Sequence, residues 1–197
     1  MGYDRLHRCG NITPVVPSPA FRANHSLSLM TPEEPSAPTF FGEPLFDALG
    51  VQARRASRGR INFDFHTFAA HPAQRFLNAL EPGSYVRPHR HCEPFKDETF
   101  VVLRGAVGIL LFDDAGKVTE KAIIRPHGDA VGANVPGAAF HSLVCLEPGS
   151  ILFECKAGPY DRATDKDWAP WAPADDSPDA AAYLAALSAE FAMNTLD

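Results

Sequence analysis

Short apolar runs alternate with turn sequences between residues 60 and 157. These runs have the length and the Val, Ile, Leu and Phe content of strands: "INFDFHTF" (61–68), "AVGILLFDD" (106–114), "VTEKAII" (118–124), "HSLVCL" (141–146) and "SILFECK" (150–156). Segments between them, such as "DDAGK" and "EPGS", carry the Gly, Pro and Asp residues of tight turns. Many short strands without intervening helices predict a mainly β protein, an antiparallel barrel or jelly roll with short flanking helices.

Two further segments have the apolar spacing of short helices. Leu45, Phe46, Leu49 and Ala53 follow Pro44, which suits a first helical position. Near the other end, Ser177 and Pro178 suit the cap and the first position of a second helix. Its apolar stripe consists of Ala180, Tyr183, Leu184, Leu187 and Phe191. We expect this helix on the outside of the barrel. Trp168 and Trp171 would hold the linker before it, with a carbohydrate platform as the alternative interpretation.

The first part of the chain has a different composition. Six of the eighteen prolines fall between Pro14 and Pro38, and this stretch has no sustained helical or strand period. It therefore predicts a disordered or loosely attached tail, and Met30 is an alternative first residue. The expected organisation is a tail (1–38), an N-terminal helical segment (39–60), a β-barrel (61–160), and a linker with a C-terminal helix packed on the barrel (161–197).

Length and charge narrow the function classes. A chain of 197 residues suits one domain with an extension, and its net charge of −6 argues against general nucleic-acid binding. There is no apolar run of eighteen residues and no apolar signal region at the start. The four cysteines show no CxxC pairing and are interpreted as reduced thiols. We therefore expect a cytoplasmic protein without nucleic-acid or membrane partners, and a homodimer is left open.

The candidate chemistry lies in "GSYVRPHRHCEPFKDETFVVLRG" (83–105). Strand side chains alternate between faces, so His89 and His91 point the same way, about 6.6–6.8 Å apart at Cα. The polar "CEPFKD" suits a hairpin loop, after which Glu98 begins the returning strand. A third strand begins at His141, after a Pro-Gly turn. Three imidazoles and one carboxylate could then converge inside the barrel, where a divalent cation would give the carboxylate its partner.

This donor set indicates which metals fit. Nitrogen and oxygen donors without thiolate suit Fe²⁺, Mn²⁺, Ni²⁺, Cu²⁺ or Zn²⁺ and leave one or two coordination positions open. Open positions admit water or substrate, whereas a purely structural site would be closed. We expect one divalent metal, bound by His89, His91, Glu98 and His141.

Arginines offer two candidate contacts for an anion. Arg87 is predicted to share the face of the two histidines, where it could grip a carboxylate or phosphate in a bidentate way. The segment "RRASRGR" (54–60) holds four arginines. It is interpreted either as a solvated helix end whose cations suit the helix dipole, or as an anion grip near a pocket mouth.

Other polar side chains could contact a substrate. Asn62, Asp64 and His66 alternate along one strand, so they share a face that points either inward or to solvent. Glu154 and Lys156 share a face in the same way. Because the carboxylate of the metal cluster is already engaged, His66 and Glu154 are the candidate catalytic bases. Asn62, Asp64, Lys156 and Arg87 are the candidate substrate contacts.

The stretch 83–105 resembles the first cupin motif, Gly-x5-His-x-His-x3–4-Glu-x6-Gly. Gly83, His89, His91, Glu98 and Gly105 match it in order, with a gap of six residues between the second histidine and the glutamate. The second cupin motif, Gly-x5-Pro-x-Gly-x2-His-x3-Asn, is only partly present. Pro136 and His141 have its spacing, while its two glycines and its asparagine are replaced by Ala130, Ala138 and Cys145.

A closer resemblance covers about residues 55 to 187. The segments "LNALEPGSYVRPHRH", "LRG…LLFDDAG" and "GPYDRATDKDWAPWAP" are similar to the WbuC-type cupin-fold metalloproteins of bacteria. The resemblance implies a cupin barrel, a metal site and a link to O-antigen and lipopolysaccharide synthesis, without a settled reaction. Cupins include isomerases, epimerases, dioxygenases, decarboxylases and binding proteins, and the fold does not choose among them.

The function expected from these features is a metal-dependent enzyme. It would act on a small polar metabolite such as a sugar derivative or carboxylate, in an isomerase- or epimerase-like reaction. An iron-dependent dioxygenase and a non-catalytic protein that binds metal or a small ligand are the alternatives.

Overall fold

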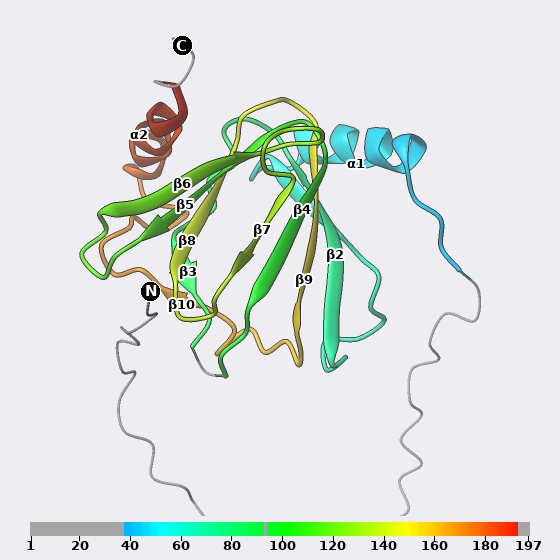
Figure 1. The fold of residues 1–197 in the computed structure, drawn as a ribbon, viewed down its shortest axis with the longest axis horizontal. Coiled ribbons are helices and arrows are strands. Elements are labelled where there is room, and N and C mark those ends of the chain that lie inside the picture. Colours follow the sequence, from blue (N-terminus) through cyan, green and yellow to red (C-terminus); the bar gives the residue numbers. More distant parts are fainter. Residues whose placement is uncertain (1–37, 93, 193–197) are drawn as a thin grey trace, which may run out of the picture. The chain divides into compact units, whose positions relative to one another are not determined.

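The computed structural model describes residues 38–92 and 94–192. Two five-stranded antiparallel sheets face each other in this range, and two short helices flank them (Figure 1). The predicted mainly β fold, an antiparallel barrel with short flanking helices, is therefore confirmed. The predicted tail lies outside the described residues apart from Pro38, and Met30 lies outside them as well.

Each sheet combines strands that are distant in the sequence. In spatial order, the first sheet consists of β1 (Arg60–Asp64), β2 (Ala73–Leu80), β9 (Ser150–Ala157), β4 (Glu98–Arg104) and β7 (Gly132–Val135). The second consists of β10 (Asp167–Trp168), β3 (His89–Arg90), β8 (Phe140–Cys145), β5 (Val107–Phe112) and β6 (Val118–Ile124). Glu98 is the first residue of β4, as predicted, so the polar loop before it ends at the sheet.

The apolar core lies between the two sheets. Phe100 and Val102 of β4 pack there with Leu80 and Leu152 of the same sheet. The facing sheet contributes Val107, Ile109, Leu143 and Cys145. Burying each large apolar side chain stabilises the fold by roughly 1.5–3 kcal/mol before the loss of conformational entropy is subtracted. Because strand side chains alternate, Glu98 lies on the same face of β4 as Phe100 and Val102 and so points between the sheets.

Helix α1 (Glu43–Arg55) covers the outer face of the first sheet. Glu43 lies in its first turn and Arg54 and Arg55 in its last, which suits the charges of the helix dipole. Its buried residues pack against Ile151 and the outward-facing residues of β2, namely Phe46, Leu49 and Ala53 against Leu77 and Ala79. The predicted first helix is thus present at the predicted place.

Helix α2 (Ala180–Ala192) covers the outer face of the second sheet, beside β5 and β8. It buries Ala180, Leu184, Leu187 and Phe191, which are four of the five stripe residues predicted. A Cβ atom on Gly108 of β5 would lie 2.4 Å from the Phe191 ring, so the close approach of α2 requires glycine there. Among the described residues, none of the helices is long and apolar enough to cross a membrane.

Candidate metal centre

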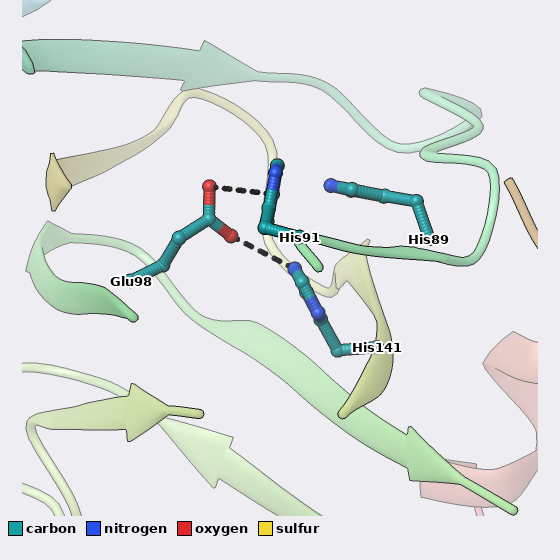
Figure 2. A group of neighbouring side chains, drawn as sticks. All are labelled: His89, His91, Glu98 and His141. Atoms are coloured by element: carbon teal, nitrogen blue, oxygen red, sulfur yellow. Dashed lines mark hydrogen bonds and ion pairs between the residues drawn. The ribbon is translucent and has the colours of Figure 1, made fainter. Parts of the chain in front are cut away.

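The four predicted ligands converge in the structure (Figure 2). His89 of β3 and His141 of β8 face each other across the strand pair, His91 follows β3, and Glu98 opens β4 on the other sheet. Each residue offers a ligand atom, and these atoms all lie within 4.8 Å of one another. None of the four is more than 3% exposed. The cluster thus fits a metal site, with both sheets contributing donors.

A backbone carbonyl orients each imidazole through its Nδ1 atom. His89 contacts the carbonyl of Arg87 at 2.9 Å, His141 that of Ala139 at 3.0 Å, and His91 that of Asp165. A carbonyl oxygen only accepts hydrogen bonds, so Nδ1 carries the proton and Nε2 keeps its lone pair. Metal-binding histidines are commonly held in this way, because it fixes the tautomer and the direction of the ring.

The Glu98 carboxylate faces two of these Nε2 atoms. Its Oε1 lies 3.1 Å from His91 Nε2, and its Oε2 lies 2.9 Å from His141 Nε2. With Nδ1 protonated, each Nε2 atom can only accept a hydrogen bond, and it faces a carboxylate oxygen that also only accepts. His91 Nε2 has no hydrogen-bond partner among the described residues. A positive charge between them removes this repulsion. The orphaned nitrogen and the three-histidine, one-carboxylate donor set therefore both fit a divalent cation.

The electrostatics keep the donors in their ligand forms. Burial favours the neutral acid, but without a metal a proton shared with Nε2 of His141 or His91, together with the charge of Lys156, outweighs it and holds the pKa of Glu98 well below its usual range. Burial, followed by the charge of Lys166, holds the pKa of His89 well below its usual range. Glu98 is thus ionised and His89 neutral around neutral pH, as metal binding requires.

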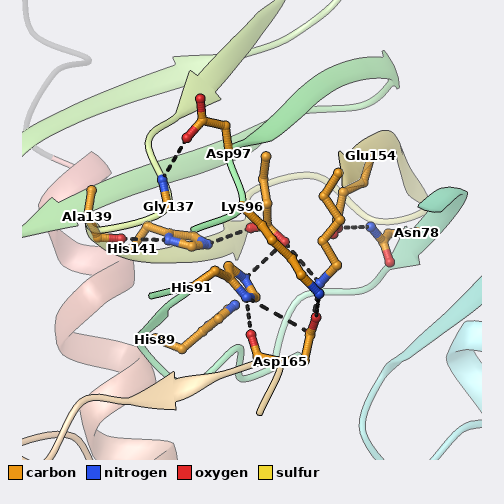
Figure 3. Close-up of polar contacts among 12 residues, drawn as sticks. Asn78, His89, His91, Lys96, Asp97, Gly137, Ala139, His141, Glu154 and Asp165 are labelled. Carbon is orange, nitrogen blue, oxygen red and sulfur yellow. Dashed lines mark hydrogen bonds and ion pairs between the residues drawn. The ribbon is translucent and has the colours of Figure 1, made fainter. Parts of the chain in front are cut away.

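A buried ionic network lies behind the cluster (Figure 3). The Asp165 carboxylate accepts a hydrogen bond from Lys156 Nζ at 2.8 Å and lies 3.4 Å from Lys96 Nζ. Lys156 Nζ is also 3.3 Å from Glu98, and Lys96 Nζ donates to the carbonyl of Pro159 at 2.5 Å. Sequence reasoning missed Lys96 and Asp165, because no motif or spacing connects them with the histidines.

The cluster opens onto a cleft of about 730 Å³. His89, Glu98 and His141 line it, together with Asn62, Asp64, His66, Glu154 and Lys156. These polar side chains therefore face the cleft, and Asn62 and Asp64 also remain exposed to solvent. In the strand pairing, Asn62 lies opposite Asn78 and Asp64 opposite Phe76, so the part of the cleft lined by β1 and β2 is partly polar.

Arg87 is placed differently from the expectation. It is not among the residues that line the cleft, and its guanidinium donates to the carbonyl of Ala169 at 3.1 Å. The expectation assumed that strand alternation extends back to Arg87. However, β3 begins only at His89, so residue 87 does not follow the alternation of the strand.

The two candidate bases lie at different places in the cleft. Glu154 is on β9, next to β4, and its Oε2 accepts a hydrogen bond from Asn78 at 2.8 Å. Burial, followed by the charge of Glu98, raises the pKa of Glu154 well above its usual range. His66 follows β1, at the edge of the first sheet and three strands from β4 in the strand order. Glu154 is therefore the candidate that lies beside the metal cluster.

The two tryptophans of the linker have different surroundings. Trp168 pairs with His89 in the β10–β3 ladder, and their ring centroids are 5.5 Å apart. It lines the cleft and is 43% exposed. Trp171 instead packs against Phe112 and Phe140 on the outer side of the second sheet. The linker is therefore held at both positions, and one tryptophan also forms part of the cleft.

Comparisons with known proteins found similarities over part of the chain. The model of a family described as "Domain of unknown function (DUF6016)" matches residues 41–124. No curated protein matches the chain. The solved structure of KdgF from Halomonas sp. is 22% identical, covering 53% of this chain and 82% of that chain, with a TM-score of 0.41.

Two enzymes with solved structures are also similar. L-ribose isomerase from Cellulomonas parahominis is 12% identical, covering 57% of this chain and 70% of that chain, with a TM-score of 0.45. Oxalate decarboxylase from Lactobacillus farciminis is 16% identical, covering 55% of this chain and 30% of that chain, with a TM-score of 0.41. In this chain, the barrel holds a buried cluster of three histidines and one glutamate that fits a divalent metal.

Proposed function

We propose that this chain is a metal-dependent enzyme that acts on a small polar metabolite such as a sugar derivative. The observation that carries the proposal is that three of the four clustered donors line a cleft, whereas a purely structural metal site would be closed. The volume of about 730 Å³ lies within the range usual for small-molecule sites. The reaction that we propose is of the isomerase or epimerase kind.

Each residue has a proposed role. His89, His91, Glu98 and His141 would bind one divalent ion, for which iron, manganese, zinc and nickel are the candidates. A bound ion supplies Lewis-acid polarisation of a carbonyl or ene-diolate oxygen. Asn62, Asp64 and Lys156 would hydrogen-bond to the hydroxyl groups of the substrate. His66 would contact the part of the substrate that is farthest from the cluster.

Glu154 is the proposed group that moves the proton. It lines the cleft next to Glu98, and the raised pKa keeps it protonated at a pH where ordinary carboxyl groups are ionised. Such a carboxyl group can donate a proton to substrate and take one back in its ionised form. The hydrogen bond from Asn78 fixes the direction of the carboxyl group in the cleft.

The experiment is a test of solvent proton exchange. Protein purified without an affinity tag is analysed for metal, loaded separately with each candidate ion, and incubated in D₂O with aldoses, ketoses, sugar phosphates and small carboxylates. We expect deuterium incorporation at the carbon next to the carbonyl. Glu154→Gln should keep the metal and lose the exchange, because it keeps the shape of the side chain but not its proton.

The same experiment separates the alternatives. Oxygen consumption with the iron-loaded protein would support a dioxygenase, and binding of a compound without exchange would support a non-catalytic binding protein. If Glu154→Gln exchanged as fast as the unaltered protein, the role of Glu154 would be wrong. The similarity to WbuC-type proteins adds the hypothesis that the metabolite belongs to O-antigen synthesis, so nucleotide-linked sugars are included among the compounds.

A further inference from the structure

One wall of the cleft is a segment of residues 158–168, which we call the strap. Tyr160, Arg162, Lys166 and Trp168 of the strap line the cleft. The strap is fastened to the metal cluster by Asp165, whose backbone carbonyl holds His91 and whose carboxylate binds Lys156. A second attachment is the hydrogen bond from Lys96 to the carbonyl of Pro159. The positions of the strap side chains are therefore tied to those of the ligands.

Lys166 is a half-buried cation on this strap. Its Nζ lies 5.4 Å from the centroid of the Trp168 ring, and that ring lies 5.5 Å from the His89 ring. Lys166 and the metal ligand His89 thus both lie beside the Trp168 ring. Burial, followed by the charge of Lys156, lowers the pKa of Lys166. Throughout residues 38–92 and 94–192, no carboxylate lies within ion-pair distance of Lys166 or of Arg162.

Most carboxylates of the cleft are already engaged. Glu98 faces the histidines and Lys156, Asp165 is bound to Lys156, and Asp175 pairs with Arg60 at 3.5 Å. Glu154 accepts a hydrogen bond from Asn78 at 2.8 Å. Asp64 is the remaining carboxylate, and it lies on β1, three strands from β4. Among the described residues that line the cleft, Lys166 and Arg162 therefore remain without an ion pair.

We propose that the ligand of this cleft is an anion, whose carboxylate or phosphate group is bound by Lys166 and Arg162 while its remaining polar groups reach the metal cluster. A half-buried ammonium gains a charge-assisted hydrogen bond from such a group, and a guanidinium can bind it with two parallel hydrogen bonds. The inference rests on the proposed function, because the anion site belongs to the same cleft. It assigns the anion contact to the strap, and not to Arg87, which is engaged with Ala169.

The test compares three compounds that share one sugar ring. Glucose is neutral, glucuronate carries a carboxylate, and glucose 6-phosphate carries a phosphate. Their binding to the zinc-loaded full chain is measured by titration calorimetry. We expect at least one anion to bind about 10-fold more tightly than glucose, a difference that one charge-assisted contact provides. The preferred anion distinguishes a carboxylate ligand from a phosphate ligand.

Matched variants show which residues provide the preference. Lys166→Met should weaken the preferred anion about 10-fold and leave glucose unchanged, whereas Lys166→Arg should keep most of the preference. Arg162→Met should have a smaller effect in the same direction. Arg125→Met removes an exposed arginine outside the cleft and serves as the control. The metal content of each variant is measured first, so that a misfolded protein is recognised.

The outcomes separate the inference from the proposed function. Equal binding of glucose and both anions, including no binding of any of them, overturns the anion site, and so does an unchanged anion affinity of Lys166→Met. A protein that prefers anions but shows no metal-dependent proton exchange supports the anion site and contradicts the enzymatic proposal. A protein that exchanges protons on neutral sugars, without preference for anions, supports the enzymatic proposal and overturns the anion site.

Discussion

At the scale of single residues, the metal cluster depends on how each imidazole is held. Each Nδ1 contacts a backbone carbonyl, which no side-chain substitution elsewhere removes directly. His89, His91 and Glu98 could be predicted, because strand alternation and a recognisable spacing are local properties of the sequence. Asp165 and Lys166 could not be predicted, because their place beside His91 depends on the path of the strap, more than 70 positions later in the chain.

Substitution of a ligand should remove the metal. In His89→Ala and His141→Ala we expect a loss of metal affinity of at least about 100-fold, because even partners outside the ligand shell typically contribute 10- to 100-fold. His127→Asn is the matched control, since His127 is exposed and its φ of 59° is one that asparagine tolerates. Metal content after chelation and reloading is the measurement. Full metal content in the two alanine variants would show that the cluster is not the metal site.

Removal of the Asp165 carboxylate should destabilise the fold. Asp165→Asn keeps the backbone carbonyl that holds His91 but leaves the buried Lys96 and Lys156 without their shared anion. Breaking a buried ion pair in this way costs about 3–5 kcal/mol, which urea denaturation at equilibrium can measure. Asp114→Asn, which alters an exposed ion pair with Arg90, should change stability by less than about 1 kcal/mol. Equal effects of the two variants would contradict the importance of the buried network.

At the scale of helices and strands, the elements that could be predicted were those with a regular local pattern of apolar and polar residues. The hairpin of β5 and β6 was predicted, because apolar runs flank a turn at Gly116, whose φ of 86° favours glycine. Strand β2 was not predicted. Five of the six residues from Arg75 to Leu80 are buried, so buried and exposed positions do not alternate along this part of the strand. The position of Arg87 was predicted differently for a related reason. The alternation of side chains does not show at which residue a strand begins.

The contact between β5 and α2 offers a test at this scale. In Gly108→Ala the new Cβ would meet the Phe191 ring, so we expect a loss of about 1–3 kcal/mol from overpacking. Phe191→Leu should recover part of this loss in the double variant, because the smaller side chain makes room, and a double-mutant cycle measures the coupling. Gly42→Ala is the control, since its Cβ would meet no atom within 4 Å. Additive effects of the two substitutions would show that α2 does not pack on β5 in this way.

At the scale of the whole molecule, the fold should not depend on the metal. The core between the sheets and the clusters under α1 and α2 consist of apolar side chains outside the metal cluster. Proteins that fold only around an ion lack such a core. We expect the metal-free protein to keep its far-UV circular dichroism spectrum and to unfold cooperatively. A metal at 1,000 times its Kd should then raise the free energy of unfolding by about 4 kcal/mol. Loss of the spectrum on chelation would show that the ion is structural.

The strap gives the cleft two separable parts. The metal donors come from β3, β4 and β8 and from the residue after β3, while the strap supplies Tyr160, Arg162 and Lys166, which are not among the metal donors. The strap contacts the metal ligands at Asp165, which holds His91, and at Trp168, which pairs with His89. An exchange of residues 160–164 for another sequence, with Asp165 retained, should therefore alter which compounds bind without altering which ion does. Chains with this barrel could diversify in specificity through one short loop while their metal chemistry stays the same.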